Sequence, residues 1–397
     1  MEGEVGLNEL RRPFLQGPIV SLVAYNYFFY AIVSIFISYL PVYFTSQGIS
    51  PVQIGILLGV GPFISIISPP IWGYLSDKYK TVKNILILTL VATILFGTFM
   101  FRSVSFEWMF FYVLVFNFFM SPIGPLTDSL TYRVSEVYRI PFGSIRLFGS
   151  VGFAITAIFM GFVFERIGLG YISWVFLAFG LIALYTCTRL SDAPSSLKPV
   201  SLRSIFSVFQ EKRILWFLFV IFTLSIPHRI NDGFVGVYIE SLGGTTGLVG
   251  TAWFFATGSE ALLFGLSVRW LRQGRELQLI AWAAVFYCVR WILCALLADP
   301  VLVTYLQLFH GLSFAIYYLA SLQYLYRLIP PELKSTGQTV FAAVFFGFAG
   351  IVGSLIAGWI FEAYNGQFLY ITMTAFSLMG LVLVFITMFR ERTMSRQ

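Results

Sequence analysis

The sequence predicts an all-α membrane protein with about twelve transmembrane helices. Hydrophobic residues make up 58% of the 397 residues and charged residues only 11%, whereas an ordinary soluble domain is about one quarter charged. Aromatic residues contribute 19%, which suits lipid-facing surfaces and interfacial belts better than a compact soluble core. Both observations indicate that a lipid bilayer surrounds this chain.

Apolar segments long enough to cross a bilayer follow one another along the whole chain. A hydrocarbon core about 30 Å thick needs roughly 20 residues of helix. Windows of that length pick out about twelve segments, several of which contain Pro or Gly, as membrane helices tolerate. The predicted segments are 18–44, 51–75, 84–103, 107–131, 143–164, 168–189, 214–240, 247–270, 277–298, 300–326, 336–361 and 367–389.

Lys and Arg residues gather in alternate loops and in the two tails. Positive charge in a short loop favours the cytoplasmic side because it is hard to translocate. We therefore predict that both termini are cytoplasmic and that the number of helices is even. The same distribution explains the net charge of +7, so no nucleic-acid partner is expected. The predicted cytoplasmic set is Arg11, Arg12, Lys78, Lys80, Lys83, Arg133, Arg139, Arg189, Lys198, Arg203, Lys212, Arg213, Arg269, Arg272, Arg275, Arg327, Lys334, Arg390, Arg392 and Arg396, whereas the alternate set holds only Arg102 and Arg166.

The longest polar stretch, residues 191–213, divides the predicted helices into two groups of six. Gly161-Phe-Val-Phe-Glu165 closes the fifth segment and Gly358-Trp-Ile-Phe-Glu362 closes the eleventh, which indicates a duplication. Transporters with parallel repeats bind their substrate near mid-membrane, at the interface between the repeats. The predicted division is a cytoplasmic tail at 1–17, a six-helix bundle at 18–190, a cytoplasmic linker at 191–213, a second bundle at 214–389 and a cytoplasmic tail at 390–397.

A few ionisable residues lie inside the apolar segments and mark the candidate functional site. A charge at mid-bilayer costs on the order of 3 kcal/mol, so it is kept when it is paired or used. One interpretation is that these residues only hold helices together. The other is proton coupling, because a carboxylate in a low-dielectric cavity can take a proton and lose it when an Arg approaches. The residues are Asp128, Arg146, His228, Arg229, Asp232, Glu260, Arg290 and His310.

The pattern of Cys and His residues argues against an enzyme or a metal protein. The three cysteines, Cys187, Cys288 and Cys294, have no paired spacing, so neither a disulfide framework nor a metal motif is expected. The two histidines match no catalytic or metal-binding pattern. We expect no enzyme activity, no metal and no cofactor.

One loop carries a resemblance to a known family. Gly73-Tyr-Leu-Ser-Asp77-Lys-Tyr-Lys80 resembles the signature of the major facilitator superfamily between its second and third helices. The resemblance implies the fold of that superfamily, with two pseudo-symmetric six-helix halves. It also implies that Asp77 caps a neighbouring helix and that Gly73, Asp77 and Lys80 help to gate the cytoplasmic side. Thr81 and Val82 replace the usual Gly-Arg of the signature, so the match is partial.

Further motifs resemble the branch that holds the oligosaccharide-proton symporters and the 3-phenylpropionic acid transporters. In this branch the resemblance implies that Asp128 and Arg146 bind substrate, that Glu260 is the acidic residue of the eighth helix, and that Arg290 and His310 take part in coupling. The motifs are Ser121-Pro-Ile-Gly-Pro-Leu-Thr-Asp128-Ser-Leu, Phe142-Gly-Ser-Ile-Arg146-Leu-Phe-Gly149-Ser-Val-Gly-Phe153, Ser259-Glu260-Ala, Val289-Arg290-Trp291 and Gln307-Leu-Phe-His310-Gly-Leu-Ser-Phe314.

One position departs from the sugar symporters of this branch. They carry a proton-bearing Glu three residues after the His, and Ser313 stands there in this chain. The proton must then sit elsewhere, with Glu260, Asp128 and Asp232 as candidates, or the coupling must differ.

The predicted function is a proton-coupled symporter that imports a small organic solute, such as the aromatic carboxylate 3-phenylpropionate. Arg146 and Arg290 could hold a carboxylate bidentately, and aromatic side chains could line the rest of the pocket. A sugar is an alternative, because acids with a stacking Trp253 or Trp291 suit hydroxyl-rich ligands, and a drug-proton antiporter is another. The expected partners are the solute, protons and the lipid bilayer, and the chain is expected to be a monomer in the cell inner membrane.

Overall fold

The computed structural model describes residues 17–192, 211–330 and 333–394, and these residues form helices without any strand. Twelve helical stretches in these ranges are long and apolar enough to cross a membrane, which confirms the predicted all-α class and segment count. The predicted N-terminal tail up to residue 16, most of the predicted linker (193–210) and residues 395–397 lie outside the described residues.

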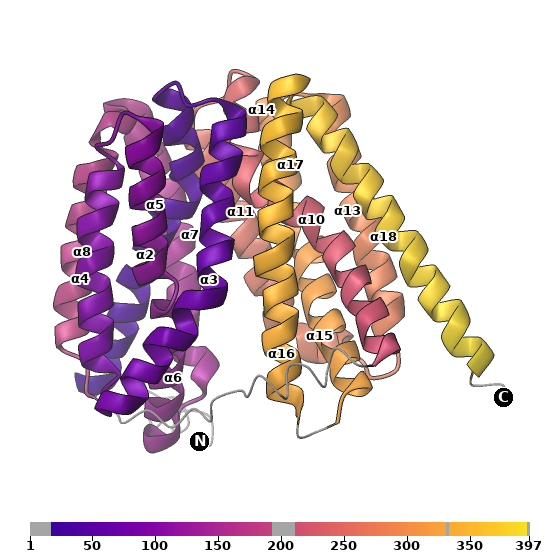
Figure 1. Cartoon of the computed structure of the whole chain (residues 1–397), viewed down its shortest axis with the longest axis horizontal. Helices are drawn as coiled ribbons and strands as arrows, with labels where there is room; N and C mark the ends of the chain where they lie inside the picture. The colour runs from indigo at the N-terminus through magenta and orange to yellow at the C-terminus, as the bar shows by residue number, and fades with distance from the viewer. Residues whose placement is uncertain (1–16, 193–210, 331–332, 395–397) are drawn as a thin grey trace, which may run out of the picture. The chain divides into compact units, whose positions relative to one another are not determined.

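The chain divides into two compact units, and we describe each by itself. The first unit comprises residues 1–43 and 64–198, and the second comprises 44–63 and 199–397. The first unit is built mainly from α2 (Gly17–Ser46), α3 (Pro51–Tyr79), α4 (Lys83–Met100), α5 (Phe106–Met120), α6 (Ile123–Tyr138), α7 (Phe142–Ile167), the short η1 (Leu169–Tyr171) and α8 (Ile172–Thr188), and Figure 1 labels its long helices.

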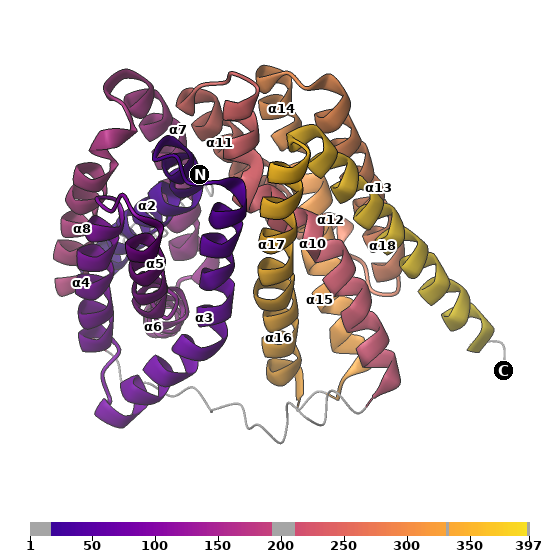
Figure 2. The same cartoon turned by 45° about the horizontal axis from the view of Figure 1, so that its top comes forward.

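The second unit contains the remaining helices, several of which are interrupted. Its elements are α10 (Lys212–Ser241), α11 (Thr246–Gly265), α12 (Ser267–Trp270), α13 (Glu276–Leu297), α14 (Pro300–Leu306), η2 (Gln307–Phe309), η3 (Gly311–Ala315), α15 (Ile316–Leu328), α16 (Lys334–Ala342), η5 (Ala343–Phe348), α17 (Ala349–Ala363) and α18 (Gly366–Met394). Within this unit α13 packs along α18 and α10 packs along α17, as both views show (Figures 1 and 2).

The first half of α3 belongs to the second unit, where it packs closely on α17. The predicted bundles at 18–190 and 214–389 stay a prediction. A Cβ added to Gly55 would lie 2.5 Å from the backbone oxygen of Ser354 and 3.1 Å from Cα of Gly358. The side chain of Glu362 also accepts a hydrogen bond of 2.9 Å from the backbone N–H of Val52.

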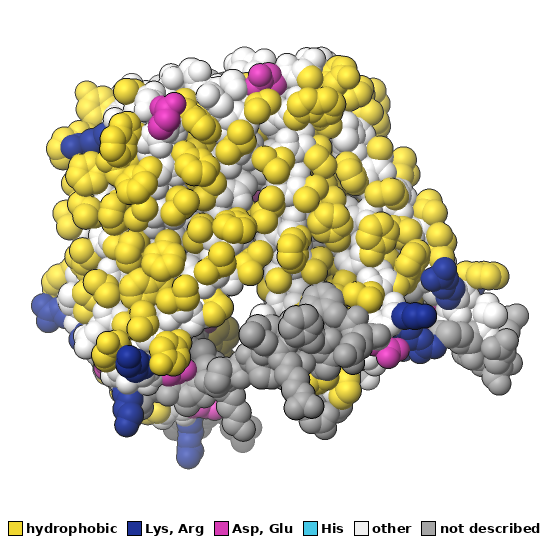
Figure 3. All heavy atoms as spheres, viewed as in Figure 1, with side chains coloured by type: hydrophobic (Ala, Val, Ile, Leu, Met, Phe, Trp, Pro, Cys, Tyr) yellow, Lys and Arg dark blue, Asp and Glu magenta, His cyan; other side chains and the backbone are white. Residues whose placement is uncertain are grey.

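The surface of the described residues is that of a protein in lipid. Hydrophobic side chains cover the middle of the helices on the face in Figure 3, and Lys and Arg side chains appear near helix ends. Large apolar side chains that would be buried in a soluble protein are exposed here, for example Trp282, Leu296 and Phe389. Exposed apolar area on this scale marks contact with an apolar medium.

Two of the crossing helices contain a π-helical segment, η3 and η5. Single π-turns inside α-helices are frequently found at functional sites because they redirect side chains. In the tenth crossing stretch, Pro300–Leu328, the 3-10 turn η2 and the π-segment η3 meet at His310. The regular helix is therefore broken at one of the predicted site residues.

Candidate functional site

The break in the regular helix allows His310 to approach helix α11. Gly311 follows His310 and lies so close to α11 that an added Cβ would meet Ser259, with the carbonyl carbon of Ser259 at 2.7 Å. The N–H of Gly311 also donates to the hydroxyl of Ser259 at 3.0 Å. This contact places Nε2 of His310 3.4 Å from Oε2 of Glu260, the next residue of α11. The structure thus pairs two of the predicted site residues.

Arg290 in α13 is fully buried and holds the other side of the same segment. Its guanidinium NH1 lies 3.4 Å from Nδ1 of His310 and donates to Oγ of Ser313 at 3.3 Å, and its NH2 donates to Oε1 of Gln307. The guanidinium carbon stacks 4.4 Å above the ring of Trp291. A buried Arg with these partners orients the side chains around it.

Asp232 in α10 is shared by two basic side chains of its own helix. Its Oδ2 lies 2.7 Å from NH1 of Arg229 and 3.4 Å from Nε2 of His228. Residues three and four apart on a helix face the same side, so the sequence order of these three residues already brings them together. Pro227 precedes His228 inside the helix and leaves one backbone carbonyl without its usual helical partner.

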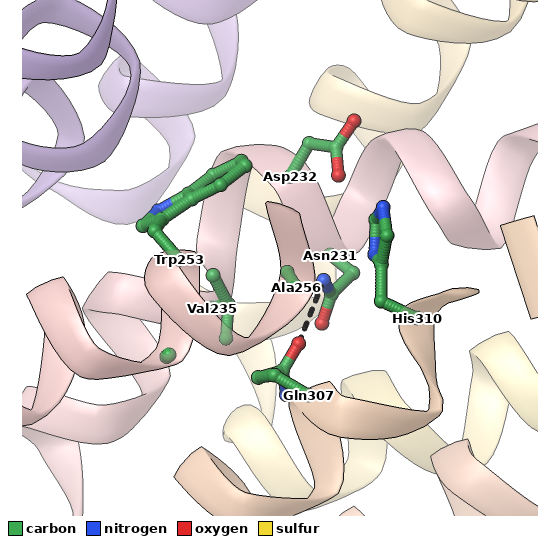
Figure 4. Close-up of a pocket in the computed structure, with 8 residues that line it drawn as sticks. Asn231, Asp232, Val235, Trp253, Ala256, Gln307 and His310 are labelled. Atoms are coloured by element: carbon green, nitrogen blue, oxygen red, sulfur yellow. Dashed lines mark hydrogen bonds between the residues drawn. The ribbon is translucent and has the colours of Figure 1, made fainter. Parts of the chain in front are cut away.

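A small pocket lies beside these groups, and Figure 4 shows its side chains converging from α10, α11 and the broken tenth stretch. The amide of Asn231 donates to Oε1 of Gln307 at 3.3 Å and its own oxygen accepts from the hydroxyl of Tyr370 at 3.0 Å. These side chains leave no space for even a water molecule between them. A solute can therefore bind here only after the lining side chains move apart. The lining residues are Asn231, Asp232, Val235, Ala252, Trp253, Ala256, Gln307 and His310.

The first unit holds the other predicted pair. Nε of Arg146 in α7 lies 3.2 Å from Oδ1 of Asp128 in α6, and its guanidinium carbon lies 4.1 Å above the ring of Tyr30. Gly149 makes room for this stack, since a Cβ there would lie 2.6 Å from the Tyr30 ring. The side chains of Arg146 and Asp128 are 29% and 43% exposed, so both can be reached by a solute.

The predicted gating motif lies at the end of α3. Lys80 has a left-handed backbone with φ of 52°, which ends the helix, and a Cβ added at Gly73 would meet nothing within 4 Å. Among the described residues Oδ1 of Asp77 is buried without a hydrogen-bond partner. The N-terminus of α4 is capped by Asp192, whose Oδ1 accepts from the N–H groups of Val82 at 3.1 Å and Lys83 at 3.0 Å. The gating role stays a prediction.

Several functional candidates were missed because their side chains are uncharged or lie at predicted segment ends. Asn231 and Gln307 are amides within apolar segments, where only charged residues and histidines give a sequence signal. Glu276 lies just before the predicted start of the ninth segment, yet it is fully buried and pairs with Arg327 at 2.6 Å. It also accepts from Gln323 at 3.2 Å, and so joins α13 to α15. Acidic residues in a first helical turn are a signal that could have found it.

Within the described ranges no group of three or more His, Cys, Asp or Glu side chains is arranged to hold a metal ion. The twelve candidate membrane crossings in the described ranges define a polytopic membrane protein. A family model described as the MFS_1 like family matches residues 19–372. The chain belongs to this family, whose members are major facilitator transporters and not enzymes.

Known proteins similar to this chain are transporters. It is 28% identical to a maltose permease of Geobacillus stearothermophilus over 87% of this chain and 88% of the relative. It is 26% identical to a probable 3-phenylpropionic acid transporter of Escherichia coli, strain K12, over 92% and 96% of the two chains. The crystal structure of the nucleoside transporter NupG matches with a TM-score of 0.84, 17% identity and coverage of 93% and 98%. The predicted fold and superfamily are confirmed, and the chain is a multi-pass membrane transporter.

Proposed function

We propose that this protein is a proton-coupled symporter that imports a small, uncharged, hydroxyl-rich solute with one flat face, of the sugar or nucleoside class. The observation that carries the proposal is that His310 takes part both in the pocket and in the ionisable cluster. It lines the pocket, and it contacts both Glu260 and Arg290. A titratable side chain in both places lets protonation and solute binding influence each other.

The solute class follows from the pocket lining. Asn231, Gln307 and Asp232 offer amide and carboxylate groups that bind hydroxyls, and Trp253 offers an aromatic face. The described lining contains no Lys or Arg, and a carboxylate solute would meet the carboxylate of Asp232. The similarity to a maltose permease supports the same class.

An aromatic carboxylate is the second candidate, and Arg146 is the observation that favours it. Its guanidinium is partly exposed and can exchange Asp128 for a substrate carboxylate with bidentate geometry. Arg290 is not available to bind a substrate carboxylate, because it is fully buried and already contacts Gln307, Ser313 and His310. The similarity to a probable 3-phenylpropionic acid transporter agrees with this candidate.

The proposal places the protein in the cell inner membrane as a monomer with both termini cytoplasmic and without a cofactor. The driving force is the proton gradient. One proton that moves down 100 mV releases about 2.3 kcal/mol, which could concentrate a solute roughly fiftyfold.

The test is solute-driven proton movement in proteoliposomes loaded with a pH-sensitive dye. Maltose, sucrose, uridine and 3-phenylpropionate are added in turn. We expect internal acidification with maltose, sucrose or uridine that is lost in Trp253→Ala but kept in Trp282→Ala, a control Trp on the exposed surface. Acidification only with 3-phenylpropionate, lost in Arg146→Gln, would favour the second candidate. Efflux of lipophilic dyes without any acidification would identify an antiporter instead.

A further inference from the structure

His228 lies at the centre of the ionisable cluster, although neither the family motifs nor the pocket includes it. It is 2% exposed, and its ring stacks on Phe314 with centroids 4.4 Å apart and planes 5° apart. Its ring centroid lies 5.3 Å from that of His310. Its Nε2 faces Oδ2 of Asp232 at 3.4 Å. His228 therefore contacts both Asp232 and His310, the partner of Glu260.

The hydrogen-bonding pattern identifies where a proton can bind on this ring. A neutral imidazole carries one N–H, and the carboxylate of Asp232 is an acceptor, which assigns that N–H to Nε2. Nδ1 then holds the lone pair, and among the described residues it is buried without a hydrogen-bond partner. Addition of a proton at Nδ1 forms one N–H bond and breaks none within the protein.

The charges around His228 balance when both imidazoles are neutral. The surrounding carboxylates are Asp232 on α10 and Glu260 on α11, and the surrounding guanidinium groups are Arg229 on α10 and Arg290 on α13. A proton bound to His228 therefore gives the cluster a net positive charge. A charge inside a membrane needs a partner of opposite charge, and the carboxylate of Asp232 is that partner. The other titratable groups facing this region are His310, Tyr287 on α13, Tyr317 on α15 and Tyr370 on α18.

We propose that His228 binds the coupled proton, an inference that rests on the proposed proton symport. Ser313 cannot take this part, because its hydroxyl accepts from Arg290 and donates to the backbone oxygen of Phe309 at 2.9 Å.

The pocket senses this proton through Asp232. Oδ2 of Asp232 is the common acceptor for Arg229 and His228. Protonation of His228 gives Asp232 a second cation and weakens its hold on Arg229. Because Asp232 also lines the pocket, the state of His228 changes the acceptor that a solute hydroxyl meets.

The first experiment needs no solute, because the chain contains only two histidines. Protein labelled with ¹⁵N-histidine, free of any histidine tag and reconstituted in liposomes, gives two sets of ring signals by solid-state NMR. His228→Phe keeps a stacking ring on Phe314 and assigns the signals, with His228→Gln as a second variant. We expect the Nδ1 signal of His228 to change from that of an unprotonated ring nitrogen to that of a protonated one as the pH is lowered. A His228 that stays neutral at every pH at which the protein remains folded would overturn the inference.

The second experiment separates proton movement from solute movement. With the same four solutes as probes, we expect His228→Phe to reduce solute-driven proton uptake about tenfold or more, while exchange of labelled solute across the membrane stays within about twofold. Phe345→Leu alters another ring packed 5.4 Å from His228 without removing a titratable group, and should keep both activities. Full proton uptake in His228→Phe would contradict this inference alone. Absence of proton uptake in the unsubstituted protein would contradict the proposed symport itself.

Discussion

Arg290 is the residue whose expected role changes most once its contacts are known. From the sequence it is a candidate ligand for a carboxylate. In the structure its guanidinium is buried against Gln307, Ser313, His310 and Trp291, and Arg290 is not among the pocket residues. It therefore positions the groups that a solute and a proton meet.

The first prediction separates a positioning residue from a binding residue. Asn231→Ala removes a pocket amide and should weaken solute binding up to about tenfold, the loss of one hydrogen bond. Arg290→Gln should change binding less than about threefold but abolish solute-driven proton uptake. Equilibrium binding of maltose and of 3-phenylpropionate, measured beside proton uptake, checks both. A tenfold loss of binding in Arg290→Gln with intact coupling would show that Arg290 is a ligand.

At the level of single residues, the sequence could predict which charges matter but not their partners. Asp128 and Arg146 lie in different helices, and so do Glu260 and His310, so the sequence alone does not give their distances. Asn231 and Gln307 gave no signal, since an amide in an apolar segment is also a common way to join helices. The structure shows that these two amides contact each other and line the pocket.

At the level of elements, the contact between α11 and the broken tenth stretch holds the site together. Gly311 allows the close approach, and the hydroxyl of Ser259 accepts from its N–H. Any side chain at Gly311 would push α11 away and lengthen the contact between Glu260 and His310.

The second prediction tests this contact. Gly311→Ala should cost about 1–3 kcal/mol of stability, as overpacking does, and should reduce proton uptake. Thermal unfolding in detergent measures the first effect and dye-loaded liposomes the second. Gly258→Ala is the matched control, because a Cβ there meets nothing within 4 Å and Ala favours a helix over Gly by about 1 kcal/mol. Equal stability of both variants would contradict the role of Gly311.

The elements themselves were largely predictable, because apolar stretches of about 20 residues have few alternatives to a membrane helix. The irregular turns were not. Neither the π-segment at Gly311–Ala315 nor that at Ala343–Phe348 has a sequence pattern that differs from an ordinary membrane helix. The packing of the first half of α3 on α17 was not predictable either, because it joins segments that are far apart in the sequence.

At the level of the whole molecule, the distribution of Lys and Arg gives the third prediction. Both termini should be cytoplasmic, because the basic residues gather in the loops on their side. A green fluorescent protein fused after Gln397 should fluoresce, whereas alkaline phosphatase fused there should be inactive. Phosphatase fused in the loop that begins at Gly168, after α7, should be active. The reverse pattern of activities would show that the chain is inserted the other way.

The central claim is that a proton gradient drives uptake of the solute. The most direct measurement is accumulation of labelled maltose, sucrose or uridine in proteoliposomes with about pH 7.5 inside and about pH 6.0 outside. This pH gradient supplies roughly as much free energy per proton as a membrane potential of about 100 mV. We predict that at least one of these solutes reaches an internal concentration severalfold above the external one, and that a protonophore or Glu260→Gln abolishes this excess. Uptake that stops at equal concentrations on both sides, whatever the gradient, would contradict the account.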